Sequence, residues 1–310
     1  MILAIDIGGT FIKFGLVDDD FRISSQSKES TPTTIDDFWR ILESIVSSFK
    51  NDISGIAIAC PGKINSKHGF VFKGGLIPYL TSIPLGTRLS KIFQLPVKVI
   101  NDADAAALAE ARYGSLQDLD CGAALVLGTG VGLGLVSQGA LLTPLSVTQY
   151  LRAPSPQSLG QTVLPFQLGL FKHALFSLVA NKGSAVGFVH EASQILGLEQ
   201  DDGLAVFSAL DDNHSGQLKR LFKDYCHEIA VLILNLQSFL KLDRVVIGGG
   251  ISRQNSLIEG LVNAYEESFE ESFNEESELG FDPISIQSCH FHNDSNLLGA
   301  ASYFASENAL

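Results

Sequence analysis

The chain lacks the features that stabilise secreted proteins or anchor membrane proteins. It has only four cysteines in 310 residues, scattered without the paired spacing of disulfide or zinc sites. We therefore expect four free thiols: Cys60, Cys121, Cys226 and Cys289. No apolar run approaches the roughly 20 residues that span a bilayer, and Met1 leads into a predicted strand rather than a targeting segment. These absences predict a cytoplasmic protein without a membrane partner.

Clusters of lysine and arginine are also missing. The formal net charge is −13, with 21 basic against 34 acidic side chains. This balance argues against nucleic acid or an anionic membrane surface as the main partner. The composition is otherwise ordinary for a globular protein, and the length suffices for two domains with a substantial core.

Strands and helices alternate in the first part of the chain. Two apolar strands are predicted over residues 2–7 and 11–17, on either side of a Gly-Gly-Thr turn. Apolar residues at helical spacing predict a helix over 35–49, and a short buried strand follows over 55–60. The strand VKVI then leads into Asn101 and a further helix. This alternation predicts an α/β fold with a mainly parallel sheet.

The pattern restarts near the middle of the chain. Residues 121–141 again predict strand, glycine turn and strand, so LAIDIGGTFIKFGLVD and ALVLGTGVGLGLVSQ are two versions of one unit. Two related halves suggest an internal duplication with a cleft between two lobes. Helices are predicted from about Phe166 onward, and later elements are a helix over 255–271, a strand over 284–289 and a helix over 295–306. We expect the last helix to pack back on the N-terminal lobe.

Three glycine turns each follow an apolar strand, at residues 8–10, 128–132 and 248–250. Glycines in such turns serve either a hairpin that needs positive φ or a phosphate cradle whose backbone N–H groups approach oxygens. One turn does not separate these interpretations. Three in this order favour a nucleotide, with phosphates at the first two turns and the base and ribose at the third. The predicted nucleotide-binding residues are Asp6, Gly8, Gly9, Thr10, Lys13, Gly128, Thr129, Gly130, Gly248, Gly249 and Gly250.

Two other nucleotide-binding motifs are incomplete. A dinucleotide-binding fold requires Gly-x-Gly-x-x-Gly, but GGGISR from Gly248 and GTGVGL from Gly128 lack the final glycine. A P-loop requires Gly-Lys followed by Ser or Thr, whereas the Gly-Lys pair at residues 62–63 precedes isoleucine. Hydride transfer and P-loop hydrolysis are therefore excluded.

Polar side chains beside the first turn suit phosphates and a metal ion. Asp6 ends an apolar strand, where a carboxylate can hold Mg²⁺ through water. Thr10 and Lys13 can donate to phosphate oxygens. A solvated strand lysine without function is a nearly equal alternative for Lys13.

The pair Asn101-Asp102 lies between a predicted strand and a helix that begins near Ala103. One interpretation is an ordinary helix N-cap. The other is a carboxylate kept ionised by the helix dipole, which positions a hydroxyl and takes its proton during phosphoryl transfer. The nucleotide loops favour the second, with Asp102 as the base and Asn101 bonded to a neighbouring hydroxyl.

Two sequences begin like metal sites without completing them. HEASQ at 190–194 has Gln194 where a zinc-protease helix requires its second histidine. In CHFH at 289–292, strand alternation would place Cys289 and His290 on opposite faces. We interpret both as structural.

With these motifs the chain resembles the ROK family (repressors, open reading frames and sugar kinases) of the sugar kinase–actin superfamily, over nearly its whole length. AIDIGGTFIKFGLVD and VLGTGVGLG resemble the two phosphate motifs, VVIGGGIS the adenosine motif, and INDADAAALAE the segment with the catalytic aspartate. The resemblance assigns the base role to Asp102 and sugar binding to Asn101 and Asp102. CPGKINSKHGFVFKGG is similar to the sugar loop, which implies that Gly62 and Gly75 lie near the sugar.

The resemblance implies a two-lobed, actin-like (ribonuclease H-like) ATPase fold of the α/β class, with a duplicated core and a central cleft. Residues 1–115 with 296–310 would form the N-terminal lobe, with the first phosphate loop, the sugar loop and Asp102. Residues 116–295 would form the C-terminal lobe, with the second phosphate and adenosine loops. The implied reaction is Mg²⁺-dependent transfer of a phosphoryl group from ATP to a hexose, amino sugar or glucoside. The sequence leaves open whether the chain forms a homodimer.

One segment departs from the family pattern, which usually has a sugar-contacting Glu-x-Gly-His stretch and a Cys-x-Cys-Gly-x-x-Gly-Cys zinc site after the second phosphate motif. Residues 139–161 contain no Glu, His or Cys, so we expect no structural zinc, and Tyr150 takes the place of a tyrosine found in relatives without zinc. The alternative hypothesis is therefore a weak or inactive sugar- or nucleotide-binding homologue. A transcriptional regulator is disfavoured, because the first strand leaves no room for an N-terminal DNA-binding helix pair and the chain is acidic.

Overall fold

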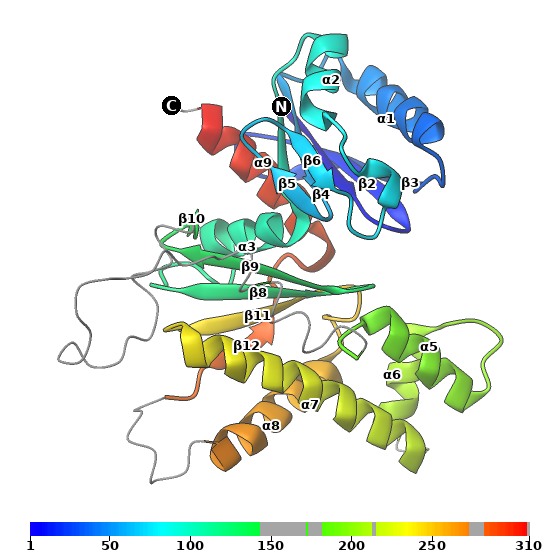
Figure 1. The fold of residues 1–310 in the computed structure, drawn as a ribbon, viewed down its shortest axis with the longest axis vertical. Coiled ribbons are helices and arrows are strands. Elements are labelled where there is room, and N and C mark those ends of the chain that lie inside the picture. The colour runs from blue at the N-terminus through cyan, green and yellow to red at the C-terminus, as the bar shows by residue number, and fades with distance from the viewer. Residues whose placement is uncertain (143–171, 173–181, 213–214, 273–281, 309–310) are drawn as a thin grey trace. The chain divides into compact units, whose positions relative to one another are not determined.

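The computed structural model describes residues 1–142, 172, 182–212, 215–272 and 282–308 (Figure 1). The chain divides into two compact units. Unit 1 comprises Met1–Gly114 and Asn293–Leu310, and unit 2 comprises Ser115–His292. The predicted helix that would begin near Phe166, and Tyr150, lie outside the described residues.

Unit 1 contains a five-stranded mixed sheet in the order β3-β2-β1-β4-β7. Its strands are β1 (Ile2–Ile7), β2 (Phe11–Val17), β3 (Ile23–Ser30), β4 (Gly55–Cys60) and β7 (Val97–Asn101). Strand β1 pairs antiparallel with β2 and parallel with β4, and β4 pairs parallel with β7. The carboxyl ends of β1, β4 and β7 consequently lie at one edge of the sheet.

Helices accompany this sheet, together with a small hairpin and a 3₁₀ turn. The helices are α1 (Ile35–Phe49), α2 (Leu85–Phe93), α3 (Asp102–Tyr113) and α9 (Ser295–Asn308). The hairpin consists of β5 (Lys63–Asn65) and β6 (Phe70–Lys73), and the 3₁₀ turn is Pro78–Leu80. Helix α9 packs on α3, β4 and β1 although it comes from the far end of the sequence (Figure 1). A Cβ on Gly299 would collide with the backbone of Ala105, so the close approach of α9 and α3 requires a glycine.

Unit 2 repeats the same strand order, β10-β9-β8-β11-β12. Its strands are β8 (Gly122–Leu127), β9 (Val131–Ser137), β10 (Ala140–Leu141), β11 (Arg244–Gly249) and β12 (Ser285–Ser288). As in unit 1, the first strand pairs antiparallel with the second and parallel with the fourth, and the fourth pairs parallel with the fifth. Equivalent strands in equivalent directions confirm the predicted duplicated core.

The helices described in unit 2 are α5 (Ala185–Leu196), α6 (Gly203–Asp211), α7 (Gly216–Phe239) and α8 (Asn255–Ser272). Helices α7 and α8 pack along one another. Each unit has its own hydrophobic cluster, centred on the β1 and β4 side chains in unit 1 and on β8, β11 and α7 in unit 2. The units therefore have separate cores.

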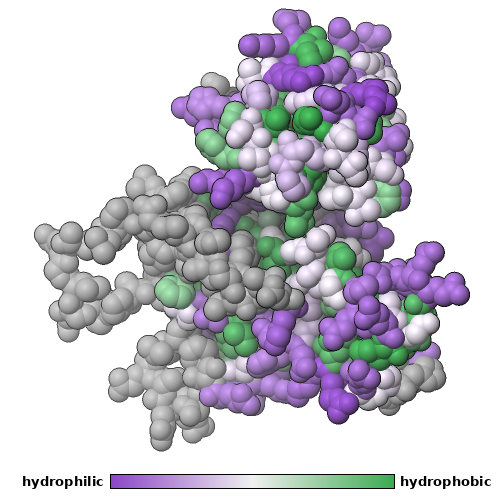
Figure 2. Space-filling view, turned by 45° about the vertical axis from the view of Figure 1, so that its right-hand side comes forward, coloured by the Kyte–Doolittle hydropathy of each residue, from purple (hydrophilic) through white to green (hydrophobic). Residues whose placement is uncertain are grey.

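Figure 2 shows hydrophobic residues (green) scattered among hydrophilic ones (purple) on the face that it draws. None of the helices in the described ranges combines the length and the apolar character that a bilayer crossing requires. The four cysteines are free and buried, as expected from their spacing.

The strands predicted over 2–7, 11–17 and 55–60 and the helix over 35–49 are confirmed residue for residue. Thr34 caps α1 by accepting a hydrogen bond from the backbone of Asp37. The sequence analysis did not predict β3, whose residues ISSQSKES are mostly polar and exposed.

Candidate active site

The junction of β7 and α3 is built by Asn101, which is the N-cap of the helix. Its side-chain Oδ1 accepts hydrogen bonds from the backbone N–H groups of Ala103, at 3.0 Å, and Asp104, at 3.2 Å. Its Nδ2 donates to Gly62 O at 3.1 Å and to Asp102 Oδ1 at 2.9 Å. Since Asn101 supplies the cap, the capping interpretation does not account for the carboxylate of Asp102.

Asp102 is the first residue of α3 and is partly buried. Its Oδ1 also accepts a hydrogen bond from the backbone N–H of Ala103 at 2.9 Å. Removal from water, followed by the negative charge of Asp6, raises the pKa of the Asp102 carboxyl to about 7, against the opposing effect of the Ala103 hydrogen bond. A carboxyl group with this pKa can exchange a proton at neutral pH.

Asp6 lies near the carboxyl end of β1 and is 6% exposed. Burial raises the pKa of its carboxyl, while the positive charge of Lys13 and a hydrogen bond from Asn296 lower it. The hydrogen bond runs from Asn296 Nδ2 to Asp6 Oδ1 at 3.0 Å. Lys13 is the antiparallel register partner of Asp6 on β2. The end of β1 thus carries a buried carboxylate between an amide and a cation.

The two glycines predicted near a sugar lie against each other. Gly62 and Gly75 both have positive φ, of 93° and 58°, and a Cβ on Gly75 would lie 3.2 Å from Gly62 Cα. A Cβ on Gly62 would collide with Lys73 O. Because Gly62 O accepts from Asn101, this glycine pair forms one side of the support for the β7–α3 junction.

The turn between β1 and β2 is closed by backbone hydrogen bonds and is exposed around Gly9 and Thr10. Gly8 N donates to Phe11 O at 3.0 Å. Thr31 Oγ1 donates to Gly8 O at 2.6 Å, and Thr31 N donates to Thr10 O at 2.9 Å. A Cβ on Gly8 would lie 2.9 Å from Phe11 O, whereas a Cβ on Gly9 would have no atom within 4 Å. Gly8 therefore serves the turn itself, and Gly9 faces open space.

In unit 2, the β8–β9 turn and the end of β11 are neighbours in the sheet. Gly248 and Gly249 pair in register with the last two residues of β8, next to Gly128. Gly249 has φ +100°, and a Cβ there would collide with Leu127 O. In contrast, nothing lies within 4 Å of a Cβ built on Gly130 or Gly250. Gly249 is needed for the backbone, while Gly130 and Gly250 leave space beside the turns.

The β8–β9 turn is also tied to α5. Gly128 N donates to Gly130 O at 2.9 Å, and Gly128 O accepts from Val186 N at 3.3 Å. Thr129 and Gly130 are exposed. The structure thus groups the predicted site residues in two sets, each within its own unit. Unit 1 holds Asp6, Gly8, Gly9, Thr10, Lys13, Gly62, Gly75, Asn101 and Asp102, and unit 2 holds Gly128, Thr129, Gly130, Gly248, Gly249 and Gly250.

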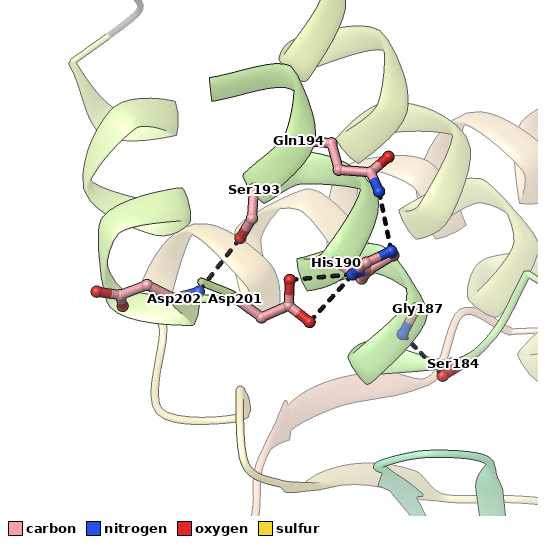
Figure 3. A network of polar contacts seen from close by, with 7 residues as sticks. All are labelled: Ser184, Gly187, His190, Ser193, Gln194, Asp201 and Asp202. Atoms are coloured by element: carbon pink, nitrogen blue, oxygen red, sulfur yellow. Dashed lines mark hydrogen bonds and ion pairs between the residues drawn. The ribbon is translucent and has the colours of Figure 1, made fainter. Parts of the chain in front are cut away.

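The incomplete zinc motif at 190–194 forms a polar network on α5 (Figure 3). His190 Nδ1 lies 3.0 Å from Asp201 Oδ1, and Gln194 Nε2 lies 3.0 Å from His190 Nε2. Both ring nitrogens of His190 therefore face side chains of this network. In the part of the chain that the structure describes, no three His, Cys, Asp or Glu side chains are grouped so as to hold a metal ion.

The second incomplete motif is divided between the interior and the surface. Cys289 is fully buried and His290 is exposed. The buried Cys289 Sγ lies 3.1 Å from the position of a Cβ on Gly248. These two side chains are not arranged to share one metal ion.

Comparisons with known proteins show which families and folds the chain is similar to. Residues 2–146 match the model of the ROK family. A β-glucoside kinase of Listeria monocytogenes is similar to this chain at 28% identity, covering 99% of this chain and 98% of that protein. The crystal structure of a ROK family protein from Streptococcus pneumoniae in complex with sucrose is 26% identical, with a TM-score of 0.74 and 99% of both chains covered. Residues 2–146 thus match the ROK family, and the chain is similar to proteins named as ROK family members over nearly its whole length.

An N-acetylmannosamine kinase of Citrobacter koseri is also similar to this chain, at 29% identity over 96% of this chain and 97% of that protein. The fold of this chain is the α/β actin-like ATPase fold, with the duplicated core described above. Its ROK motifs lie at the ends of strands, as expected for sites in open α/β sheets.

Two residues near the candidate site have no signal in the sequence analysis. Asn296 bonds to Asp6 from 290 positions away, and only the packing of α9 brings it there. Cys60 is fully buried at the end of β4, and burial, followed by the charges of Asp102 and Asp6, raises the pKa of its thiol well above the ordinary value. The Cys60 thiol is therefore neutral within the electrostatic influence of the two carboxylates.

Proposed function

We propose that this protein transfers a phosphoryl group from ATP to a hydroxyl of a hexose, amino sugar or glucoside, with Asp102 as general base. The observation that carries this proposal is the position of Asp102 at the start of α3, with a carboxyl pKa of about 7. The similarity to proteins named β-glucoside kinase and N-acetylmannosamine kinase supports the class of substrate.

In the proposed reaction, the attacking sugar hydroxyl donates its proton to the carboxylate of Asp102. The hydroxyl oxygen bonds to the γ-phosphorus of ATP, and the bond to the β-phosphate oxygen breaks to release ADP. The raised pKa favours proton acceptance as the new bond forms, because a base works best when its pKa lies near the working pH. Asp102 would hold the proton until the sugar phosphate leaves.

The contacts of Asn101 favour a positioning role over the sugar contact expected from the sequence. Its Nδ2 donates to Gly62 O and Asp102 Oδ1, and its Oδ1 accepts two backbone hydrogen bonds. The amide thus fixes the orientation of the base and ties it to the glycine pair Gly62 and Gly75. We propose that the sugar binds against this pair, with the oxygen that reacts next to Asp102.

The residues present fit a magnesium ion held mainly by phosphates and water. Asp6 is a single buried carboxylate whose charge already raises the pKa of Asp102, and Mg²⁺ typically takes one or two carboxylates and keeps several waters. Asp6 would hold the ion through water, with Asn296 fixing the other side of the carboxylate. When bound, the Mg²⁺ ion would neutralise part of the negative charge of the ATP phosphates.

Unit 2 would hold ATP with backbone rather than charged side chains. The open space at Gly130 and Gly250 allows a ligand to approach the main chain of both turns. Thr129 adds a hydroxyl to the β8–β9 turn. We propose that the β8–β9 turn binds phosphates and that the end of β11 lies against adenosine.

The proposal is tested by measuring ADP formation with MgATP and a panel of hexoses, amino sugars and glucosides. We expect at least one sugar to raise ADP formation above the sugar-free rate, with one sugar phosphate formed for each ADP.

The missing Glu-x-Gly-His stretch favours a second candidate, a protein that binds sugar or nucleotide without turnover. If no sugar raises the rate, this second candidate replaces the kinase.

A further inference from the structure

Unit 1 contains a pocket at the other end of β7 from Asp102. Its volume is about 450 Å³, and the residues that line it include Lys67, His68, Thr87, Ser90, Lys91 and Lys98. They come from the β5–β6 turn, from α2 and from the start of β7. Lys98 and Asn101 are three positions apart on β7, which corresponds to roughly 10 Å along a strand. The pocket is therefore separate from the β7–α3 junction.

The charge of this pocket is opposite to that of the chain. Acidic side chains outnumber basic ones by 34 to 21 over the whole sequence, yet no Asp or Glu is among the described residues that line the pocket. Lys98 is paired with Glu307 at 3.4 Å on an exposed part of α9. Lys67 and Lys91 add two further positive charges. Such a local excess of lysine attracts anions.

Two backbone segments that border the pocket are in close contact at Gly69 and Gly86. A Cβ on Gly69 would lie 2.9 Å from Gly86 Cα, and Gly86 N donates to Gly69 O at 2.8 Å. This contact joins the β5–β6 turn to the start of α2. Helix α2 begins at Leu85, its N-cap residue Pro84 makes no side-chain capping bond, and Gly86 and Thr87 from its first turn line the pocket. The positive end of the helix dipole therefore adds to the lysine charges.

We propose that this pocket binds a phosphate monoester of a small polyhydroxylated compound. Lys67 and Lys91, beside the paired Lys98, suit a phosphate group, because the ammonium is a compact charge that contacts phosphate oxygens. The hydroxyls of Thr87 and Ser90 can bond to hydroxyls of the same ligand, and the volume lies within the range of small-molecule sites. Under the proposed function, the product of the reaction has this chemistry. This pocket would then bind the reaction product at a place separate from Asp102.

The test is calorimetric titration of the full chain with glucose 6-phosphate, with glucose and inorganic phosphate as separate probes. We compare the wild type with the double variant Lys67→Gln/Lys91→Gln. The matched control is Lys50→Gln/Lys241→Gln, which removes two exposed lysines outside the pocket. We expect the pocket variant to bind glucose 6-phosphate about tenfold more weakly, since two partly exposed charge contacts are lost. The control should bind like the wild type.

Equal binding by the pocket variant and the wild type would overturn the proposal. So would the absence of wild-type binding up to about 10 mM, or an equal loss in the control. The variant Asp102→Asn separates this proposal from the proposed function, because it should retain the lysine-dependent binding. A chain without kinase activity that still shows this binding would leave the pocket proposal intact.

Discussion

The sheets of units 1 and 2 have the same strand order, and their first hairpins differ in charge at equivalent register positions. In unit 1, Asp6 on β1 faces Lys13 on β2. In unit 2, the residue one position before the end of β8 is Val126, and it faces Gly132 on β9. The fifth strands differ in the same way, since β7 leads into Asn101-Asp102 and β12 into Ser288-Cys289.

The difference indicates that one scaffold serves two kinds of chemistry. Unit 1 gathers carboxylates whose pKa values are raised by burial, as is common in active sites. Unit 2 instead has glycines with open space beside the main chain, and this arrangement accommodates an anion without adding negative charge. We propose that unit 1 carries out proton transfer and that unit 2 binds the phosphates.

The largest expected effect on stability is that of Gly249→Ala in unit 2. The substitution places a Cβ against Leu127 O at φ +100°, so we expect the free energy of unfolding to fall by about 3–5 kcal/mol. Urea denaturation followed by circular dichroism measures this loss. The control is Gly250→Ala, where the new Cβ meets no atom within 4 Å. Equal midpoints for the two variants would contradict the structural role of Gly249.

The next effect concerns Asp102 and its pKa of about 7 in the folded chain. An unfolded Asp titrates near pH 4, so between these values the folded state binds more protons and its stability falls as pH rises. Replacing Asp102 with Asn removes this loss. We expect the free energy of unfolding of the variant to exceed that of the wild type by about 4 kcal/mol at pH 8, with no gain below about pH 4.

Chemical denaturation at both pH values measures this difference, and Asp104→Asn is the control for removing one carboxylate from the same helical turn. A gain that is equal at both pH values would show that the titration of Asp102 is not its cause. A loss of stability at pH 8 would contradict the raised pKa.

The smallest expected effect is that of Gly130→Ala and Gly250→Ala on nucleotide binding. Neither position is crowded, so unfolding should change little, while a methyl group would occupy the space proposed for ATP. We expect the Kd for ATP to rise about tenfold in each variant, measured by calorimetry. Gly216→Ala at the start of α7 is the control, because its Cβ also meets no atom. Wild-type affinity in both turn variants would remove the turns from the nucleotide site.

The elements with strong periodicity could be predicted from the sequence. Helix α1 has apolar residues at helical spacing and a Thr cap, and β1, β2 and β4 are continuous apolar runs bounded by turns. Strand β3 could not, because an exposed edge strand has no buried face to produce alternation. Helix α2 was also not predicted, since it is short and begins after Pro84 without a capping side chain.

In the candidate site, too, only the residues marked by a local sequence pattern could be predicted. Asp6 and Asp102 could be selected because Asp6 lies near the end of an apolar strand and Asp102 follows one, at the edge of the sheet where such side chains meet. The partner Asn296 could not, since its contact with Asp6 depends on the packing of α9 through Gly299. A helix cap at the Asn101-Asp102 pair could be expected from the sequence, but that Asn101 supplies it is visible only in the structure. The pKa of about 7 at Asp102 depends on burial and neighbouring charge that the sequence does not display.

The most direct test of the central claim compares the turnover of the wild type, Asp102→Asn and Asp104→Asn on a sugar that the wild type phosphorylates. Asn has nearly the size of Asp but accepts no proton at neutral pH, and Asn101 keeps the helix cap in all three proteins. The account predicts that kcat falls about 10²–10⁴-fold in Asp102→Asn, with the KM for ATP unchanged and Asp104→Asn close to the wild type. Turnover of Asp102→Asn close to that of the wild type would contradict it.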